Sequence, residues 1–284
     1  MGTVKRVVIV GHPVAHSRSP LVHGYWLKQH GIAGEYGVRD VAPEEARDFF
    51  ARFATHGLAG CNVTIPHKEA AFNALAEADE VARALGVANT LWLEDGRLCG
   101  ANTDAPGFIG NLDATAPGWD RDRSVALVLG AGGASRAVIY GLLQRGFEKV
   151  LLANRTFARA EAVAAHFGPK VVPLAWDGLP AALKDARVLV NTTSLGMKGQ
   201  PPLDLDLSPL PASAVVADVV YVPLETPLLK AAKARGLTTV DGLGMLLYQA
   251  VPGFARWFGV TPVVDAGLRD LIVADLAAKG QLEA

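Results

Sequence analysis

The polar segments that follow the expected strands include one ammonium, that of Lys68, and one carboxylate, that of Asp104, and groups of these two types can perform acid–base chemistry on a hydroxyl. Oxidation of an alcohol removes the hydroxyl proton as hydride leaves the carbon, and the reverse reaction needs a donor at the developing alkoxide. An ammonium can supply that proton or charge, and a carboxylate can orient both the ammonium and the hydroxyl. The sequence leaves open which of the two formally transfers the proton. Lys68 also lies early in an expected helix, where the helix dipole disfavours a cation, so a functional role explains it better than a surface position.

Polar residues gather in four segments that lie at or near the ends of expected strands. The segments are residues 11–20, 62–68, 89–90 and 102–104. Open α/β sheets bind ligands at such ends. Together the segments supply hydroxyls, amides, one ammonium and one carboxylate, a set that suits a small polyhydroxylated acid.

A glycine-rich turn begins at Gly130, directly after the apolar run 125–129 and before an expected helix. The turn reads Gly130-Ala131-Gly132-Gly133-Ala134-Ser135. Gly130 allows a tight turn, and Gly132 lets the backbone approach a pyrophosphate on the free N–H groups of the helix N-terminus. Ser135 replaces the third glycine of the usual fingerprint, and it is small enough to keep the helix close to the strand. The turn therefore predicts a dinucleotide site.

Two arginines after the next expected strand favour NADP over NAD. That strand ends at Asn154-Arg155-Thr156, about 24 residues after Gly130, and Arg159 lies one helical turn further on. An NAD site usually carries an acidic residue here, which accepts from the ribose 2′-hydroxyl. Both guanidinium groups can instead face a 2′-phosphate, to which Thr156 can donate. The alternative is a solvated pair of charges at a helix start, but the position after a glycine turn favours the phosphate site.

Strand-like and helix-like stretches alternate along the chain, which predicts an α/β fold with mainly parallel sheets. The expected strands are 7–10, 36–41, one ending at 60–64, 89–92, 97–100, 125–129, 150–153, 188–191, 215–219 and 238–240. Helices are expected to begin at Ser19-Pro20, with Ser19 as the N-cap, at Pro43 and at Pro66. Further helices are expected over 134–144, 157–167, 244–258 and 264–277.

The pattern restarts after Asp104, which predicts two domains. Residues 1–105 and 242–284 are expected to form a discontinuous, three-layer α/β domain that binds substrate and carries the catalytic residues. Residues 106–241 are expected to form a Rossmann-like NADP-binding domain. The last two helices have no later strand beside which to pack, so we expect them to return to the first domain. Hinge motion near Pro106 and Asp241 is a further hypothesis.

The composition limits the classes of partner. Lys and Arg total 27 against 28 Asp and Glu, which gives a net charge of −1 and no bulk field that favours nucleic acid or an anionic membrane. Apolar runs are too short for a signal sequence or a membrane span. Cys61 and Cys99 are isolated, which fits a reducing cytosol, and the histidines lack metal-site spacing. These features predict a cytoplasmic protein with a small-molecule partner and no metal, nucleic acid or membrane association.

Eight ordered segments resemble the shikimate dehydrogenase family over nearly the whole chain. They are Ser17-x-Ser19-Pro20, Asn62-Val63-Thr64-x-Pro66-x-Lys68, Asn89-Thr90, Asn102-Thr103-Asp104-x-x-Gly107-Phe108, Gly130–Ala137, Asn154-Arg155-Thr156, Asn191-Thr192-Thr193-Ser194-x-Gly196-Met197 and Asp241-Gly242-x-x-Met245-Leu246-x-x-Gln249. Eight segments in the same order and spacing are far more specific than any one of them.

The resemblance implies a reversible step of aromatic amino acid and chorismate biosynthesis, in which 3-dehydroshikimate and NADPH give shikimate and NADP. Lys68 and Asp104 would be the catalytic pair and would also contact the substrate, whose carboxylate Ser17 and Ser19 would hold. The ring hydroxyls would be bound by Asn62, Thr64, Asn89, Asp104 and Gln249, and Tyr221 would approach the substrate. The cofactor residues would be Gly130, Ala131, Gly132, Gly133, Ala134, Asn154, Arg155, Thr156, Arg159, Thr192, Ser194, Val219, Gly242 and Met245, the last two near the nicotinamide. We expect a monomer or a homodimer.

Two departures from the family pattern keep other functions open. Gly24 stands where asparagine usually follows the His23 position, and Val87-Ala88 inverts the usual order before Asn89. One alternative is a paralogue that acts on quinate, aminoshikimate or a related cyclic hydroxy acid. Another is a non-catalytic NADP-binding sensor or scaffold, against which the presence of both Lys68 and Asp104 argues.

Overall fold

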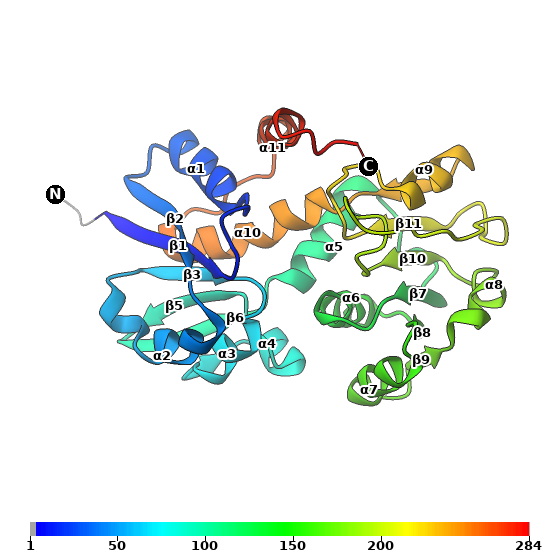
Figure 1. Cartoon of the computed structure of the whole chain (residues 1–284), viewed down its shortest axis with the longest axis horizontal. Coiled ribbons are helices and arrows are strands. Elements are labelled where there is room, and N and C mark those ends of the chain that lie inside the picture. The colour runs from blue at the N-terminus through cyan, green and yellow to red at the C-terminus, as the bar shows by residue number, and fades with distance from the viewer. Residues whose placement is uncertain (1–3, 284) are drawn as a thin grey trace. The chain divides into compact units, whose positions relative to one another are not determined.

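The computed structural model describes residues 4–283, which form two compact units with one six-stranded sheet each (Figure 1). The first unit holds the residues up to Asp104 together with Gln249–Ile272. The second holds Ala105–Tyr248 together with the residues from Val273 onward. Each unit is described by itself below.

The sheet of the first unit has the strand order β2-β1-β3-β5-β6-β4. Its strands are β1 Lys5–Gly11, β2 Gly34–Asp40, β3 Gly60–Val63, β4 Glu77–Ala78, β5 Thr90–Glu94 and β6 Arg97–Ala101. β1 is parallel to β2 and to β3, and β4 is parallel to β6, whereas β5 runs antiparallel to both β3 and β6. The carboxyl ends of β1, β3 and β6 therefore lie beside the amino end of β5. We call this border, which is formed by strand ends, an edge of the sheet.

Helices cover both faces of this sheet. On one face, α2 (Ala46–Ala51), α3 (Lys68–Asn73) and α4 (Glu80–Leu85) pack with Cys61 and Val63 of β3. Phe53 of the 3₁₀ helix Phe53–His56 joins this core, and a second 3₁₀ helix, Pro43–Glu45, precedes α2. The other face carries α1 (Ser19–Gln29) and the part of α10 (Leu243–Phe258) that belongs to this unit. There the rings of Trp26 and Phe254 lie 5.3 Å apart. The expected three-layer arrangement is confirmed.

Two expected helix starts are wrong. Arg18 is the N-cap of α1, and Ser19 is its first helical residue. The Ser17 hydroxyl accepts a hydrogen bond from the Ser19 N–H at 3.3 Å, so a side chain two residues earlier meets this free backbone donor. Helix α3 begins at Lys68 rather than Pro66, because residues 64–67 form a turn closed by the His67 N–H and the Thr64 carbonyl.

The sheet of the second unit is parallel throughout, in the order β12-β11-β10-β7-β8-β9. Its strands are β7 Val125–Leu129, β8 Lys149–Ala153, β9 Val171–Leu174, β10 Val188–Asn191, β11 Val215–Asp218 and β12 Thr238–Val240. This is the doubly wound order of dinucleotide-binding domains, with its reversal point between β7 and β10. The predicted Rossmann-like sheet is confirmed.

Each face of the second sheet has its own apolar core. Side chains of α5 (Asp104–Thr115), α6 (Gly133–Gln144) and α7 (Phe157–Phe167) pack with Ala126 and Val128. On the opposite face, α8 (Leu179–Ala182) and α9 (Pro227–Ala234) pack with Leu127 and Leu129. The remaining elements are the 3₁₀ helix Trp176–Gly178 and α11 (Ala266–Ala278). β7 is buried on both faces, which explains its unbroken apolar sequence.

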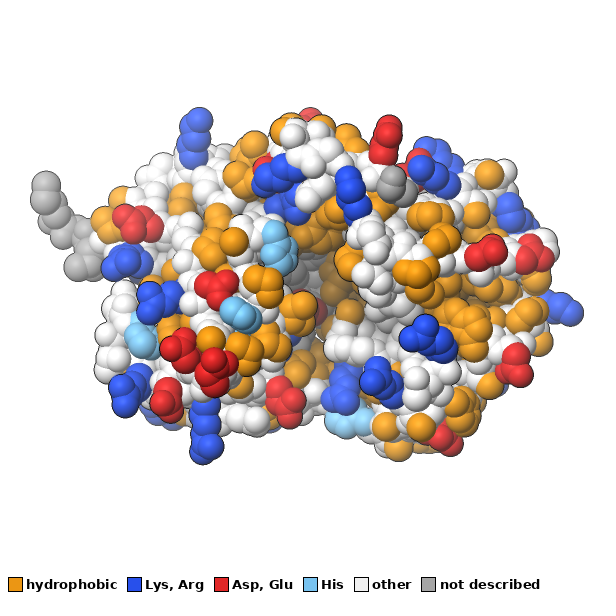
Figure 2. Space-filling model, viewed as in Figure 1, with side chains coloured by type: hydrophobic (Ala, Val, Ile, Leu, Met, Phe, Trp, Pro, Cys, Tyr) orange, Lys and Arg blue, Asp and Glu red, His pale blue; other side chains and the backbone are white. Residues whose placement is uncertain are grey.

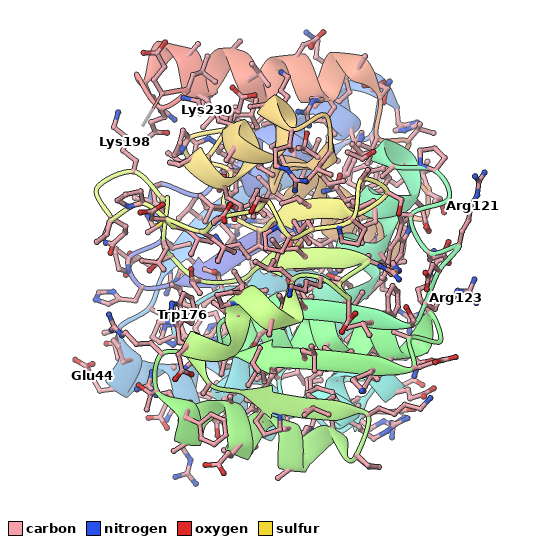
Figure 3. All side chains as sticks on the ribbon, turned by 90° about the vertical axis from the view of Figure 1, so that its right-hand side faces the viewer. Glu44, Arg121, Arg123, Trp176, Lys198 and Lys230 are labelled. Carbon is pink, nitrogen blue, oxygen red and sulfur yellow. The ribbon has the colours of Figure 1, made fainter. Side chains whose placement is uncertain are left out.

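Labelled side chains identify the two edges of the second sheet in Figure 3. Arg121 and Arg123, which precede β7, project at one edge. Trp176, which follows β9, and Lys198, which follows β10, lie at the opposite edge. The second edge is therefore the one to which the carboxyl ends of the strands point.

The surface drawn in Figure 2 interleaves basic and acidic side chains, in keeping with the balanced composition. Within residues 4–283, no helix is long and apolar enough to cross a membrane.

Candidate active site

The sheet edge of the first unit gathers most of the residues expected to bind substrate. Asn62 on β3 is directly opposite Thr90 on β5, and Thr90 is opposite Ala101 on β6. The polar segments before β5 and after β3 and β6 therefore meet, although they are far apart in the sequence. The antiparallel direction of β5 is what brings Asn89, at its amino end, to this edge.

Lys68 and Asp104 form an ion pair at this edge. The Lys68 ammonium lies 2.5 Å from Asp104 Oδ2, and the two side chains are 27% and 17% exposed. The Asn89 amide donates to the other carboxylate oxygen, Oδ1, at 2.9 Å. The backbone N–H of Asp104 donates to Asn102 Oδ1 at 3.0 Å, which fixes the start of α5. An ammonium and a carboxylate in contact, partly open to solvent, are the groups that proton transfer to or from a hydroxyl requires.

The Asn89 side chain is held by its neighbours but keeps a donor that a ligand can use. Its Oδ1 accepts from the Thr103 N–H at 2.8 Å and the Thr103 hydroxyl at 3.1 Å. Its Nδ2 contacts Gln249 Oε1 at 3.5 Å, beyond the usual range for a hydrogen bond. Gln249 thus lies beside Asn89 and Thr103, within the cluster.

The serines and Thr64 lie after neighbouring strands of the same sheet. Ser17 and Ser19 share a hydroxyl–hydroxyl hydrogen bond of 3.3 Å, and Ser19 is buried. The Thr64 N–H donates to the Val10 carbonyl at the end of β1. A Cβ at Gly11 would lie 2.4 Å from the Thr64 methyl group, so glycine is what allows Thr64 to approach this closely.

Asn62 is buried, and its amide is engaged by protein groups. Its Nδ2 donates to the Asn89 carbonyl at 3.1 Å and to the Thr90 hydroxyl at 3.0 Å. Its Oδ1 accepts from the Tyr36 hydroxyl at 2.6 Å. Tyr36 was not among the expected site residues. Its sequence position offered no signal, because the contact joins residues 26 positions apart.

In the second unit, the glycine turn lies at the reversal point of the sheet. Gly130 follows β7 with φ +100°, a conformation that L residues rarely adopt. A Cβ there would meet Thr193 Cγ2 at 2.8 Å and Thr192 Oγ1 at 2.9 Å, just after β10. The buried Thr192 hydroxyl donates to the Leu129 carbonyl at 2.7 Å and so fixes the end of β7. Ser194, on the same loop, is exposed.

Open space adjoins the next two glycines, as a bound pyrophosphate requires. A Cβ at Gly132 or Gly133 would meet no atom within 4 Å. Helix α6 begins at Gly133 without an acidic residue in its first turn, so its free N–H groups and dipole are available to an anion. The Ser135 hydroxyl donates to the Gly132 carbonyl at 2.6 Å and is buried, which explains how serine replaces the usual glycine.

The segment after β8 presents its basic residues to solvent. Arg155, Thr156 and Arg159 are exposed. The Asn154 amide accepts from the Ala131 N–H at 3.1 Å and donates to the Thr156 carbonyl at 2.8 Å, which ties this segment to the glycine turn. Cations held beside an open glycine turn fit a cofactor that carries an additional phosphate.

The other expected cofactor residues lie where β11 and β12 end. A Cβ at Gly242 would lie 2.3 Å from the Val219 carbonyl oxygen, so the two backbones are in contact. Met245 packs against the apolar core of this unit. Tyr221 is half-buried and also belongs to the second unit, so its contact with substrate stays a prediction.

Asp218, which was not expected in the site, anchors the segment that carries Val219 and Tyr221. Its Oδ1 accepts from Asn191 Nδ2 and from the Val220 N–H, both at 3.0 Å, and its Oδ2 accepts from the Thr226 hydroxyl at 2.7 Å. Burial raises the pKa of Asp218 to about 6, although these hydrogen bonds act in the opposite direction. The sequence signal that could have identified Asp218 is a carboxylate within an otherwise apolar strand.

The two thiols and His67 have the environments of structural residues. Cys61 and Cys99 are buried, and burial raises the pKa of each thiol, so neither is an activated nucleophile. The buried His67 ring bonds to the Val41 carbonyl at 2.7 Å. Among the described residues, no group of three or more His, Cys, Asp or Glu side chains could hold a metal ion.

Two family models match the chain. "Shikimate dehydrogenase substrate binding domain" matches residues 9–91, and "Shikimate / quinate 5-dehydrogenase" matches residues 117–197. A shikimate dehydrogenase (NADP(+)) of Azorhizobium caulinodans is 83% identical over 281 residues, which cover 99% of this chain and 100% of the relative. A protein of the same description from Rhodopseudomonas palustris is 61% identical, covering 98% of this chain and 100% of the relative.

Solved structures agree over the whole fold. Shikimate 5-dehydrogenase of Thermus thermophilus, in complex with NADP(H) and shikimate, has a TM-score of 0.85 at 37% identity, covering 95% of this chain and 99% of that one. Quinate dehydrogenase of Corynebacterium glutamicum, in complex with NAD, has a TM-score of 0.88 at 31% identity, with coverage of 95% and 99%. The chain belongs to the shikimate dehydrogenase family.

Proposed function

We propose that this protein catalyses the reversible reduction of 3-dehydroshikimate to shikimate with NADPH. The contact between Lys68 and Asp104, surrounded by hydroxyls and amides at one sheet edge, carries the proposal. Relatives described as shikimate dehydrogenase (NADP(+)), at 83% and 61% identity over nearly the full chain, support the substrate.

The residues of the first unit divide into three roles. Ser17 and Ser19 bind the substrate carboxylate through hydroxyls. Thr64, Asn89 and Gln249 bind ring hydroxyls, a task for which Asn89 keeps a donor. Lys68 and Asp104 hold a proton beside the reacting oxygen, where it is released in reduction and collected in oxidation. The Lys68 charge also stabilises the negative charge that develops on that oxygen.

The second unit binds the cofactor, which supplies or accepts the hydride. Gly132, Gly133 and the amino end of α6 bind the pyrophosphate, for which the open space above both glycines leaves room. Arg155, Thr156 and Arg159 bind the 2′-phosphate. Gly242, Met245 and Val219 border the nicotinamide. The two compact units correspond, in this proposal, to a substrate-binding and a cofactor-binding domain.

Initial rates of cofactor reduction test the proposal. The protein is assayed with shikimate, with quinate and without an acid, each with NADP and with NAD. We expect turnover to be fastest with shikimate and NADP. Quinate dehydrogenase among the structural neighbours makes quinate the relevant competitor. Absence of turnover with shikimate would contradict the assigned reaction, and a preference for quinate would reassign the substrate.

Two arginine variants test which residue determines the preference for NADP over NAD. Arg155→Ala should raise the KM for NADP by about 10- to 100-fold, the effect of losing a charge-assisted hydrogen bond, and leave the KM for NAD almost unchanged. Arg121→Ala is the matched control, since Arg121 is also exposed but lies at the opposite edge of the sheet (Figure 3). Equal losses with both cofactors would contradict the phosphate site.

Two coarser expectations accompany this function. Two isolated buried cysteines and an ordinary composition support a cytoplasmic location. A monomer or homodimer is the expected assembly, which light scattering coupled to size-exclusion chromatography would determine.

A further inference from the structure

A phenol, Tyr36 on β2, bonds to an amide that lies beside the proposed catalytic residues. Its hydroxyl donates to Asn62 Oδ1 at 2.6 Å. Burial raises the pKa of Tyr36 well above its usual value, so the phenol stays protonated and remains a donor. Tyr36 thereby fixes the acceptor oxygen of the amide at the end of β3.

Asn62 connects Tyr36 to the catalytic side of the site. Both Nδ2 hydrogens are used within the protein, one on the Asn89 carbonyl and one on the Thr90 hydroxyl. Asn89 differs, because its second donor has only the 3.5 Å contact with Gln249. Asn62 therefore has no donor left for a ligand, and its amide orientation is fixed by Tyr36 on one side and by β5 on the other.

Aromatic packing fixes the plane of the Tyr36 ring. The His23 ring stacks on it at a centroid distance of 4.0 Å and an interplanar angle of 5°. Burial lowers the pKa of His23 to about 3, so this partner is a neutral imidazole at physiological pH. Trp257 packs on the phenol as well, at 6.2 Å. The hydroxyl is thus held toward Asn62 without losing rotational freedom upon binding.

We propose that Tyr36 is a positioning residue for substrate recognition, which acts through Asn62. It fixes the Asn62 amide, which donates to the Asn89 carbonyl, and thereby the position of the Asn89–Asp104 pair that meets the ring. This inference rests on the function proposed above, and it changes the role expected for Asn62 from a hydroxyl ligand to a link between Tyr36 and Asn89.

Tyr36→Phe tests the proposal because it removes the hydroxyl and keeps the ring. We expect the KM for shikimate to rise about tenfold, the effect of one lost hydrogen bond to a buried acceptor, with kcat changed by less than about threefold. The KM for NADP should not change. Tyr25→Phe is the matched control, since the Tyr25 hydroxyl also donates to a side chain, Asp265, at 3.0 Å, but away from this cluster. An unchanged KM for shikimate in Tyr36→Phe would overturn the proposal.

A double-mutant cycle distinguishes action through Asn62 from a general loss of structure. Dissociation constants for shikimate are measured by calorimetry for Tyr36→Phe, Asn62→Ala and the double variant. If Tyr36 acts through Asn62, the double variant binds about as weakly as Asn62→Ala alone, whereas independent effects multiply and would overturn the proposal. Failure of the proposed function itself would appear differently, as absence of shikimate turnover in the unmodified protein and in Tyr25→Phe.

Discussion

At the scale of single residues, Lys68 and Asp104 stabilise each other where one of them alone would be unfavourable. Lys68 is the first residue of α3, where the helix dipole repels a cation. Asp104 is the first residue of α5, where the dipole favours an anion. Their contact at 2.5 Å offsets the unfavourable position of the ammonium and places it beside a partly open carboxylate.

Lys68→Ala should therefore separate catalysis from binding. We expect kcat for shikimate oxidation to fall by about 10²- to 10⁴-fold, the usual contribution of a general acid–base group. The dissociation constant for shikimate should change little, because the serines, Thr64 and Asn89 remain. Stopped-flow rates and calorimetry measure the two quantities. Lys230→Ala, at an exposed lysine of α9, is the control, and an unchanged kcat in Lys68→Ala would refute its role.

At the scale of elements, the glycines of the β7–turn–α6 segment are explained by different requirements. Gly130 is needed for the backbone, because its φ is +100° and a side chain would collide with the loop after β10. Gly132 has φ −100°, which any residue can adopt, and empty space where a Cβ would be. Its glycine is thus explained by a ligand rather than by the fold.

Two alanine variants separate these requirements. Gly132→Ala should leave the Tm within about 1 °C of the unmodified protein, since the change costs at most a few tenths of a kcal/mol without a clash. Its affinity for NADP should fall at least about tenfold, because the methyl group occupies the space of the pyrophosphate. Gly130→Ala should lower the Tm by several degrees, through roughly 1–2 kcal/mol of backbone strain plus the collision. Differential scanning calorimetry and NADP titration provide both readouts. A Gly132→Ala protein that binds NADP normally would place the pyrophosphate elsewhere.

At the scale of the whole molecule, each unit folds around its own sheet, and the residues proposed to bind ligands lie mainly where strands end. The apolar cores of the second unit cover both faces of its sheet, so polar groups are accommodated mainly at its edges. Asp218 lies at the end of β11, but its carboxyl group is unusual in being only 2% exposed. Its burial makes the stability of the protein depend on pH.

Asp218→Asn should remove part of that pH dependence. The pKa of Asp218 is raised from 3.8 to about 6, so between these values the folded protein keeps a proton that the unfolded chain has released. The stability that this group contributes is present below pH 3.8, falls as pH rises to about 6, and is constant above. A shift of this size corresponds to roughly 2–3 kcal/mol.

Thermal unfolding at several pH values measures the effect. The Tm of the unmodified protein minus that of Asp218→Asn should decrease by on the order of 5 °C between pH 4 and pH 7. Asparagine keeps an acceptor for Asn191 and Val220. The other titrating groups are the same in both proteins, so their effects cancel in the difference. A difference in Tm that is constant over this range would show that Asp218 titrates normally.

Some features followed from local sequence, and others did not. The β7 run, the glycine turn and the basic segment after β8 were predictable, because each depends on neighbouring residues. β9, Val171–Leu174, was missed because it contains Pro173, which is atypical of a strand. Proline is tolerated there because β9 is the outermost strand and has β8 as its one neighbour. The Ser19 cap was wrong because Ser17 already accepts the backbone N–H.

The sequence by itself determined the fold class, the dinucleotide turn and the set of groups that chemistry needs, because strand runs, turn residues and motif spacing are local properties. Tertiary structure decided which groups meet. Lys68 reaches Asp104 across 36 residues because the reversed direction of β5 brings the carboxyl ends of β3 and β6 to the same edge. Tyr36 reaches Asn62 across 26 residues because β2 and β3 flank β1. The Lys68–Asp104 pairing followed from the family resemblance, whereas the hydrogen bond from Tyr36 to Asn62 required the fold.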